Sequence, residues 1–126
     1  MVPATRGATV QVRGIGFVGT HTPERAAMSA FARDVLGLTP VAVDGSTADM
    51  FTLPSGDVFA VASLHEGDGV AERTIGFLVD DLDTAVDELH AAGIETDGIS
   101  ENNRYRYTHF RAPDGRLYEL VEERQR

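Results

Sequence analysis

The amino-acid sequence predicts an α+β fold in which two βαβββ modules form one curved mixed sheet around a cup-shaped cavity. Helix-like and strand-like segments follow one another in the same order twice along the 126 residues. Two stretches also share one shape, 53–63 (LPSGDVFAVAS) and 112–122 (APDGRLYELVE), in which a proline–glycine turn leads into a strand. Since neither module could cover its own sheet alone, we expect the two to pack together.

The first module is expected over about residues 10–64. Its first strand is predicted at 10–20, which is rich in β-branched residues and glycine. A helix is predicted at 25–36, where apolar residues recur at helical spacing until Gly37 stops the pattern. Three short strands, divided by DGSTA and by the turn PSGD, complete the module: 39–43, 49–53 and 58–64.

The second module, over about residues 74–122, repeats this order after a polar linker at 65–73. A strand is predicted at 74–79 (TIGFLV). The stretch DDLDTAVDELHAAG then predicts an amphipathic helix between Asp81 and Gly93, with its leucines on one face. Three strands follow, the last two joined by the turn APDGR: 94–99, 105–111 and 117–122.

Composition excludes several functions. A length of 126 residues is typical of a single domain. A net charge of −9, from 20 acidic and 11 basic residues, argues against a nucleic-acid partner and would suit a cationic ligand, although acidity also serves solubility. We expect no membrane partner, because no apolar run reaches about 18 residues. The absence of cysteine and of an apolar N-terminal stretch favours a cytoplasmic protein without disulfides.

Four stretches resemble one known family, the vicinal oxygen chelate superfamily: GIGFVGTHTPERA, FARDVLGL, IGFLVDDLDTAVDELHAAGI and FRAPDGRLYEL. That superfamily includes glyoxalase I, bleomycin-resistance proteins, fosfomycin-resistance enzymes and extradiol dioxygenases. The resemblance covers about residues 10–122 and implies the paired-module fold. It also implies a homodimer, with the modules of one chain closing together or exchanged between two chains.

The resemblance further implies where metal ligands would lie, one on the first and one on the last strand of each module. In this sequence those positions hold Phe17, Ala60, Thr74 and Glu119. A phenyl ring, a methyl group and a neutral hydroxyl are inadequate ligands for zinc, nickel or iron, and one carboxylate cannot hold a divalent ion alone. We therefore expect no metal and no other cofactor.

Strand alternation and turn geometry suggest which side chains face the cup. A tight turn at 113–116 pairs the flanking strands so that His109 lies beside Glu119, with Tyr105 and Tyr107 on the same face. The histidine and the carboxylate could act as an acid–base pair, and the two tyrosines with Phe17 could form a wall for a planar ligand. In the alternative, Glu119 is a satisfied buried polar group, His109 lies at a wet rim, and the tyrosines are ordinary strand residues.

Further candidates are weaker. Met50 and Phe51 are expected to line the cup, with core packing as the alternative role for at least one of them. His21 also falls on the cup side but stands at a helix entry, which favours a structural role. His65 and His90 are expected at the surface.

The residues leave three functions open. The first is a metal-independent protein that binds a small organic ligand, aromatic or cationic, in the cup through Phe17, Met50, Phe51, Tyr105, Tyr107, His109 and Glu119. The second is a metal-independent lyase, isomerase or cyclase in which Glu119 and His109 are catalytic. The third is a metal-dependent glyoxalase or dioxygenase with an unusual site.

Overall fold

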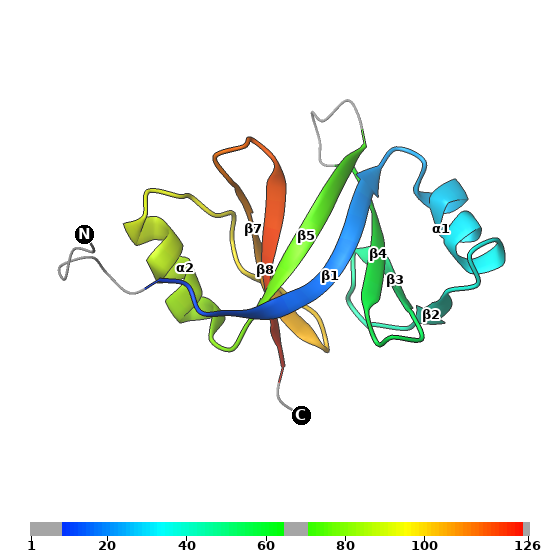
Figure 1. The fold of residues 1–126 in the computed structure, drawn as a ribbon, viewed down its shortest axis with the longest axis horizontal. Coiled ribbons are helices and arrows are strands. Elements are labelled where there is room, and N and C mark those ends of the chain that lie inside the picture. The colour runs from blue at the N-terminus through cyan, green and yellow to red at the C-terminus, as the bar shows by residue number, and fades with distance from the viewer. Residues whose placement is uncertain (1–8, 65–70, 125–126) are drawn as a thin grey trace.

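The computed structural model describes residues 9–64 and 71–124 and has two helices and eight strands. The elements are β1 (Val12–Thr22), α1 (Arg25–Asp34), β2 (Thr39–Val41), β3 (Ala48–Thr52), β4 (Val58–Ser63), β5 (Glu72–Val79), α2 (Leu82–Ala91), β6 (Ser100–Glu101), β7 (Tyr105–Arg111) and β8 (Leu117–Glu123). The strands form one mixed sheet in the order β2-β3-β4-β1-β5-β8-β7-β6. Figure 1 shows this sheet curling between α1 and α2, which lie at its two ends, so the predicted α+β cup is confirmed.

The two modules meet at the centre of the sheet, where β1 and β5 pair antiparallel. Each of these strands also runs parallel to the last strand of its own module, β1 with β4 and β5 with β8. Corresponding positions of the two modules pair with each other or with corresponding partners in the sheet. The facing pairs are Phe17 with Gly76, Gly19 with Thr74, Gly19 with Ala60 and Gly76 with Glu119. The cup is thus built by both modules of one chain.

The repeated turns at residues 53–57 and 112–116 have the same hydrogen bonds. In each, the first residue donates its N–H to the carbonyl of the fifth, at 2.9 and 3.1 Å. The turn glycine, Gly56 or Gly115, donates to the carbonyl of the first residue, at 2.9 and 2.8 Å. Both glycines have positive φ, 93° and 80°, a conformation that other residues rarely adopt. The sequence likeness of the two stretches therefore reflects one turn used twice.

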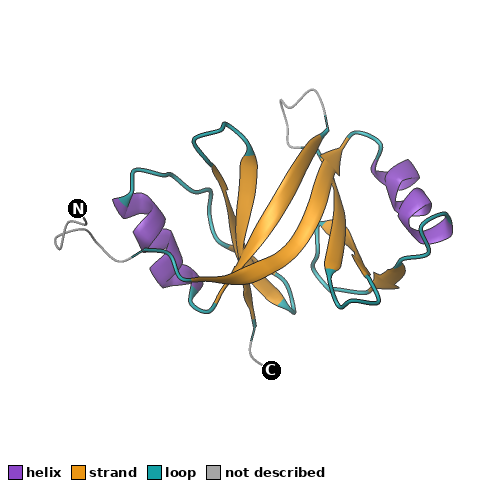
Figure 2. Cartoon of the chain, in the orientation of Figure 1, coloured by secondary structure: helices purple, strands orange, loops and turns teal. Residues whose placement is uncertain are grey.

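The two helices lie at the two ends of the sheet (Figure 2), and the apolar core forms two separate clusters beneath them, on the outer face of the sheet. Ala32 of α1 packs with Phe51 and Val61, all of them at most 3% exposed. The other cluster joins α2 to β5 and β8 through Val79, Leu82, Ala85 and Leu120. Because side chains alternate along a strand, the residues between these face the inner side and are left for the cup.

The helices follow the predicted pattern closely. Asp81 caps α2, since its carboxylate accepts the backbone N–H of Thr84 at 3.1 Å and the Thr84 hydroxyl at 2.9 Å. Helix α1 ends at Asp34 rather than at residue 36. No helix among the described residues is long and apolar enough to cross a membrane.

One predicted strand, 94–99, is wrong. Within it the structure has a single isolated bridge, between Thr96 and Phe110, and the neighbouring strand β6 is only two residues long. The reason is the side chain of Asp97, which accepts the hydroxyl of Thr108 at 2.9 Å and the N–H of His109 at 2.7 Å. The Asp97 side chain thus takes the His109 N–H in place of a backbone carbonyl, and the Asp97 N–H keeps one backbone bond to the His109 carbonyl at 3.0 Å.

The linker prediction can be compared only at its end. Residues 65–70 lie outside the described residues, as does the expected surface position of His65. Residues 72 and 73, which the sequence pattern assigned to the linker, begin β5.

Candidate functional site

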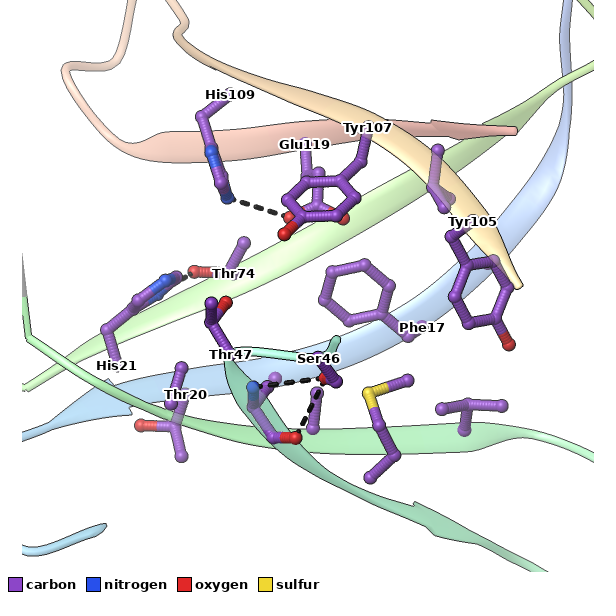
Figure 3. Close-up of a pocket in the computed structure, with 18 of the residues that line it drawn as sticks. Phe17, Thr20, His21, Ser46, Thr47, Thr74, Tyr105, Tyr107, His109 and Glu119 are labelled. Carbon is purple, nitrogen blue, oxygen red and sulfur yellow. Dashed lines mark hydrogen bonds and ion pairs between the residues drawn. The ribbon is translucent and has the colours of Figure 1, made fainter. Parts of the chain in front are cut away.

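A cavity of about 570 Å³ occupies the inner face of the curved sheet (Figure 3). Both modules line it, β1 and β4 from the first and β5, β7 and β8 from the second. The polar end of the cavity consists of Thr20, His21, Thr74, His109 and Glu119. The aromatic wall consists of Phe17, Tyr105 and Tyr107, and further apolar side chains, including Ile15, Met50, Val58 and Leu78, complete the lining.

The structure brings most of the sequence-predicted site residues to this cavity, namely Phe17, Met50, Tyr105, Tyr107, His109 and Glu119. The prediction that Phe51 lines the cup is wrong. Phe51 is 3% exposed and packs against Ala32 and Val61 under α1, because neighbouring residues of a strand point to opposite faces. Met50 therefore lines the cup, and Phe51 belongs to the core.

The ring of Phe17 lies against the facing glycine of the other module. A Cβ atom placed on Gly76 would be 2.2 Å from Cε2 of Phe17, far inside van der Waals contact. Gly19 on β1 leaves similar space, since its Cβ would be 3.4 Å from Cε1 of the same ring. The absence of side chains at Gly76 and Gly19 thus creates the space that the Phe17 ring fills.

Glu119 and His109 form a hydrogen-bonded pair across the β7–β8 hairpin, with Nε2 of His109 2.8 Å from Oε1 of Glu119. The register places the two residues opposite each other, as the turn geometry predicts. Both side chains are largely buried, 16% and 10% exposed for His109 and Glu119. Figure 3 shows both directed into the cavity from adjacent strands.

Burial and pairing change the pKa of both groups. Burial raises the pKa of Glu119 above its ordinary value, and the hydrogen bond and charge of His109 only partly oppose that rise. Burial lowers the pKa of His109, but the hydrogen bond and the charge of Glu119, with those of Asp97, outweigh it and raise the pKa overall. The raised pKa values favour the protonated form of each group, at the two ends of the short Nε2–Oε1 contact.

Asp97 approaches the other nitrogen of the same ring, although sequence reasoning assigned it no role. Its Oδ2 lies 3.0 Å from Nδ1 of His109. The signal available in the sequence was the Asp–Gly pair at 97–98, which is typical of a turn rather than of a strand interior.

His21 also belongs to the polar end, although its place at a helix entry favoured a structural role. Its Nδ1 lies 2.7 Å from the hydroxyl of Thr74, and its ring centroid is 6.1 Å from that of His109. Counting alternate residues from Phe17 does place His21 on the cup side. The contact with Thr74 depends on the β1–β5 register and could not be read from either strand alone. His90 is exposed on α2, as expected.

At the edge of the cavity Arg25 is held in place by Asp49. The guanidinium donates to both carboxylate oxygens, at 3.1 and 2.9 Å, and the Ser29 hydroxyl adds a third bond of 2.6 Å. The hydrogen bonds from Arg25 hold the pKa of Asp49 below its ordinary value. This two-point geometry fixes the start of α1 to β3 beside the cup.

The four expected ligand positions do not supply a set of metal-binding side chains. Of the four expected ligand positions, Phe17 offers a ring that fills the space next to Gly76, and Ala60 offers a methyl group. The hydroxyl of Thr74 is hydrogen-bonded to His21, and Glu119 is bonded to His109. Across residues 9–64 and 71–124, no three His, Cys, Asp or Glu side chains are grouped so that they could hold a metal ion.

Comparisons with known proteins agree with this fold. The family described as the Glyoxalase/Bleomycin resistance protein/Dioxygenase superfamily matches residues 14–120. Methylmalonyl-CoA epimerase from Mycobacterium tuberculosis superposes with a TM-score of 0.72 at 20% identity, covering 96% of this chain and 95% of that one. No curated protein matches the sequence.

Two further solved structures are larger proteins. A Mn(II)-bound glyoxalase from Novosphingobium aromaticivorans has a TM-score of 0.63 at 24% identity, covering 89% of this chain and 39% of that one. The E323L mutant of homoprotocatechuate 2,3-dioxygenase from Brevibacterium fuscum has a TM-score of 0.72 at 17% identity, covering 99% and 36%. At these identities the likeness is one of fold.

The contact between Phe17 and Gly76 generates a prediction about stability. Gly76→Ala should lower the free energy of unfolding by about 1–3 kcal/mol, because the new methyl group must displace the ring. In a Phe17→Ala background the same change should cost much less, which a double-mutant cycle measured by denaturant unfolding will show. Gly14→Ala on β1 is the matched control, since its Cβ would meet no atom within 4 Å. Equal costs of Gly76→Ala in both backgrounds would contradict the contact.

Proposed function

Because the chain belongs to the glyoxalase/bleomycin resistance protein/dioxygenase superfamily, we propose that it binds a small organic molecule in the cup without a metal ion. The observation that carries this proposal is the cavity itself, which joins an aromatic wall to a buried, hydrogen-bonded pair of a carboxyl group and an imidazole. Sites for small molecules are commonly concave, largely apolar and supplied with a few well-placed polar groups.

The size and lining of the cavity fit this role. Its 570 Å³ lies within the range of about 300–1,000 Å³ that small-molecule pockets span. The rings of Phe17, Tyr105 and Tyr107 offer flat apolar area, which suits a planar or aromatic molecule. Smaller side chains in the lining, Ala48, Ala60 and Ala62, leave the first-module side of the cavity apolar.

The polar end would orient the ligand. A hydrogen-bonding group of the ligand can meet Glu119, His109 or the hydroxyl of Thr20 there. If Glu119 is ionised when the ligand binds, a cationic group is favoured. If the pair shares its proton, a neutral donor or acceptor fits as well. The sum of charges on the chain, −9, supports the cationic case only weakly.

A second candidate function is supported by the same pair, namely a metal-independent lyase, isomerase or cyclase. In its carboxylate form Glu119 can take a proton from a C–H or O–H group of the ligand, leaving the electron pair on the ligand, and can return the proton to another atom of it. Buried carboxylates with raised pKa values are suited to such transfers near neutral pH. The third possibility, a metal-dependent glyoxalase or dioxygenase, has no adequate set of donors among the described residues.

The first prediction of this proposal concerns binding. The probe is whichever small molecule is released from the purified protein by solvent extraction and identified by mass spectrometry. Tyr107→Ala should weaken its rebinding by about 1–3 kcal/mol in calorimetry, as loss of a buried aromatic contact does. Ile99→Ala, which shortens an exposed side chain that does not line the cavity, is the control.

Glu119→Gln separates the two functions. It keeps the shape and removes the charge, so a cationic ligand should bind more weakly, most clearly at low salt. For an enzyme, turnover of the molecule should collapse while its binding survives. Unchanged affinity and turnover in Tyr107→Ala, His109→Ala and Glu119→Gln would refute the proposal that this cavity is the functional site.

The second prediction concerns metal content. After dialysis against metal-free buffer, elemental analysis should find well below one Zn, Ni, Mn or Fe per chain, because the cup offers a ring, a methyl group and engaged polar groups at the expected ligand positions. One metal ion per chain that disappears in Glu119→Gln would show that the cup does hold a metal. In that case the metal-dependent alternative becomes the better one.

The third prediction concerns assembly. We propose a homodimer in the cytoplasm. The exposed apolar residues Phe31, Val35 and Leu36, which are 44–68% exposed near the end of α1, support a partner surface. Light scattering over a range of concentrations should give twice the chain mass of 13.6 kDa. A monomer mass at every concentration would exclude the dimer and leave the cup unaffected, because both of its halves come from one chain.

A further inference from the structure

We infer that Asp97 is a positioning residue of the cup, which fixes a proton on Nδ1 of His109 and thereby directs the shared proton to the Nε2–Glu119 hydrogen bond. This inference adds to the proposed function and rests on it only in taking the cup as the ligand-binding site. Asp97 is not among the residues that line the cavity, so it would act through His109 rather than on a ligand.

Asp97 is bonded to the His109 residue at three points. Its Oδ1 accepts the His109 backbone N–H at 2.7 Å, and its Oδ2 lies 3.0 Å from Nδ1 of the ring. Its own backbone N–H donates to the His109 carbonyl at 3.0 Å. The buried hydroxyl of Thr108 adds a bond to Oδ1 of 2.9 Å. The carboxylate is therefore held in one orientation relative to the imidazole ring.

These contacts dictate which nitrogen is protonated. A carboxylate is an acceptor when ionised, so Nδ1 must be the donor in its contact with Asp97. The second nitrogen, Nε2, then either donates to ionised Glu119 or accepts from protonated Glu119. In both cases one proton lies between Nε2 and Oε1, and in both cases Nδ1 carries its own.

The charges around the ring are consistent with this arrangement. Burial raises the pKa of Asp97, but the His109 N–H, the Thr108 hydroxyl and the charge of His109 outweigh it, so the pKa is lowered and the group stays ionised. Other titratable groups face His109 as well: Glu119 from β8, His21 from β1 with its ring 6.1 Å away, and Tyr107 on β7 at 5.8 Å. Asp97 and Glu119 contact the two ring nitrogens from opposite sides of the imidazole.

Asparagine at this position should reverse the proton assignment. The His109 backbone N–H at 2.7 Å requires an acceptor, so the amide oxygen must take the place of Oδ1. The amide NH₂ group then faces Nδ1 and can only donate to it. Nδ1 becomes an acceptor, the ring proton moves to Nε2, and the pair holds one proton fewer.

The experiment is ¹⁵N NMR of the imidazole groups in the ligand-free protein at neutral pH. The chain has four histidines, and the His109 signals are assigned as those missing from His109→Gln. In the wild-type protein the form of His109 with a proton on Nδ1 should outnumber the form without it by about tenfold or more, as expected for one charge-assisted hydrogen bond. In Asp97→Asn the ratio should reverse, and the titration of His109 should move to lower pH, since an attracting negative charge has been removed.

The matched control is Asp114→Asn. The Asp114 carboxylate also accepts one backbone N–H, from Arg116 at 2.9 Å, and one hydroxyl, from Tyr118 at 2.8 Å, but it lies at the β7–β8 turn and not beside the His109 ring. The substitution Asp114→Asn should leave the His109 signals unchanged. A reversed tautomer in Asp97→Asn but not in Asp114→Asn supports the inference.

The inference is overturned if Nδ1 of His109 is unprotonated in the wild-type protein, a result that does not depend on the folding of any Asp97 variant. It is also overturned if folded Asp97→Asn keeps Nδ1 protonated. Because no ligand is present, these outcomes are independent of the binding test. Loss of binding in the Tyr107 variant with a fixed tautomer would support both proposals, and binding at another place with a fixed tautomer would refute only the proposed function.

Discussion

The antiparallel pairing of β1 with β5 is the constraint on which the rest of the structure depends. It joins two modules that would each leave one face of a short sheet open, and it sets Phe17 opposite Gly76 and Gly19 opposite Thr74. Parallel pairing of each strand with the last strand of its own module then brings Ala60 and Glu119 to the same region. A shift of this register by one residue would turn each of these side chains to the other face of the sheet.

Within this frame the two modules have diverged at equivalent positions. The first module contributes a phenyl ring and a methyl group, and the second contributes a hydroxyl and a carboxylate. The site is therefore asymmetric although the backbone around it is nearly symmetric. The second module also supplies His109 and Asp97, so the titratable groups Asp97, His109 and Glu119 belong to one half of the molecule, and the bulk of the apolar lining belongs to the other.

The parts that could be predicted from the sequence are those governed by local rules. A five-residue turn fixes the pairing on either side of it, and so His109 opposite Glu119 followed from counting residues. Alternation along β3 requires Met50 and Phe51 to face opposite sides, but it does not say which of the two faces the cup. The contact of His21 with Thr74 links residues of different modules and needed the assembled sheet. The strand prediction for 94–99 was wrong because apolar and β-branched residues indicate a strand, while the Asp97 side chain accepts the His109 N–H in place of a backbone carbonyl.

The separation of the two faces of the sheet has a consequence for how such proteins change over time. The clusters under the helices and the residues around the cup alternate along the same strands, so a substitution at an inward position such as Met50 leaves the packing of its outward neighbour Phe51 intact. Where an inward side chain does not itself pack against the sheet, as Phe17 does against Gly76, ligand preference can change without a loss of stability. Solved structures that share this fold at only 17–24% identity are consistent with that separation. The fold therefore says little about which ligand or reaction the cup serves, because the residues that line the cup are mostly different from those that pack under the helices.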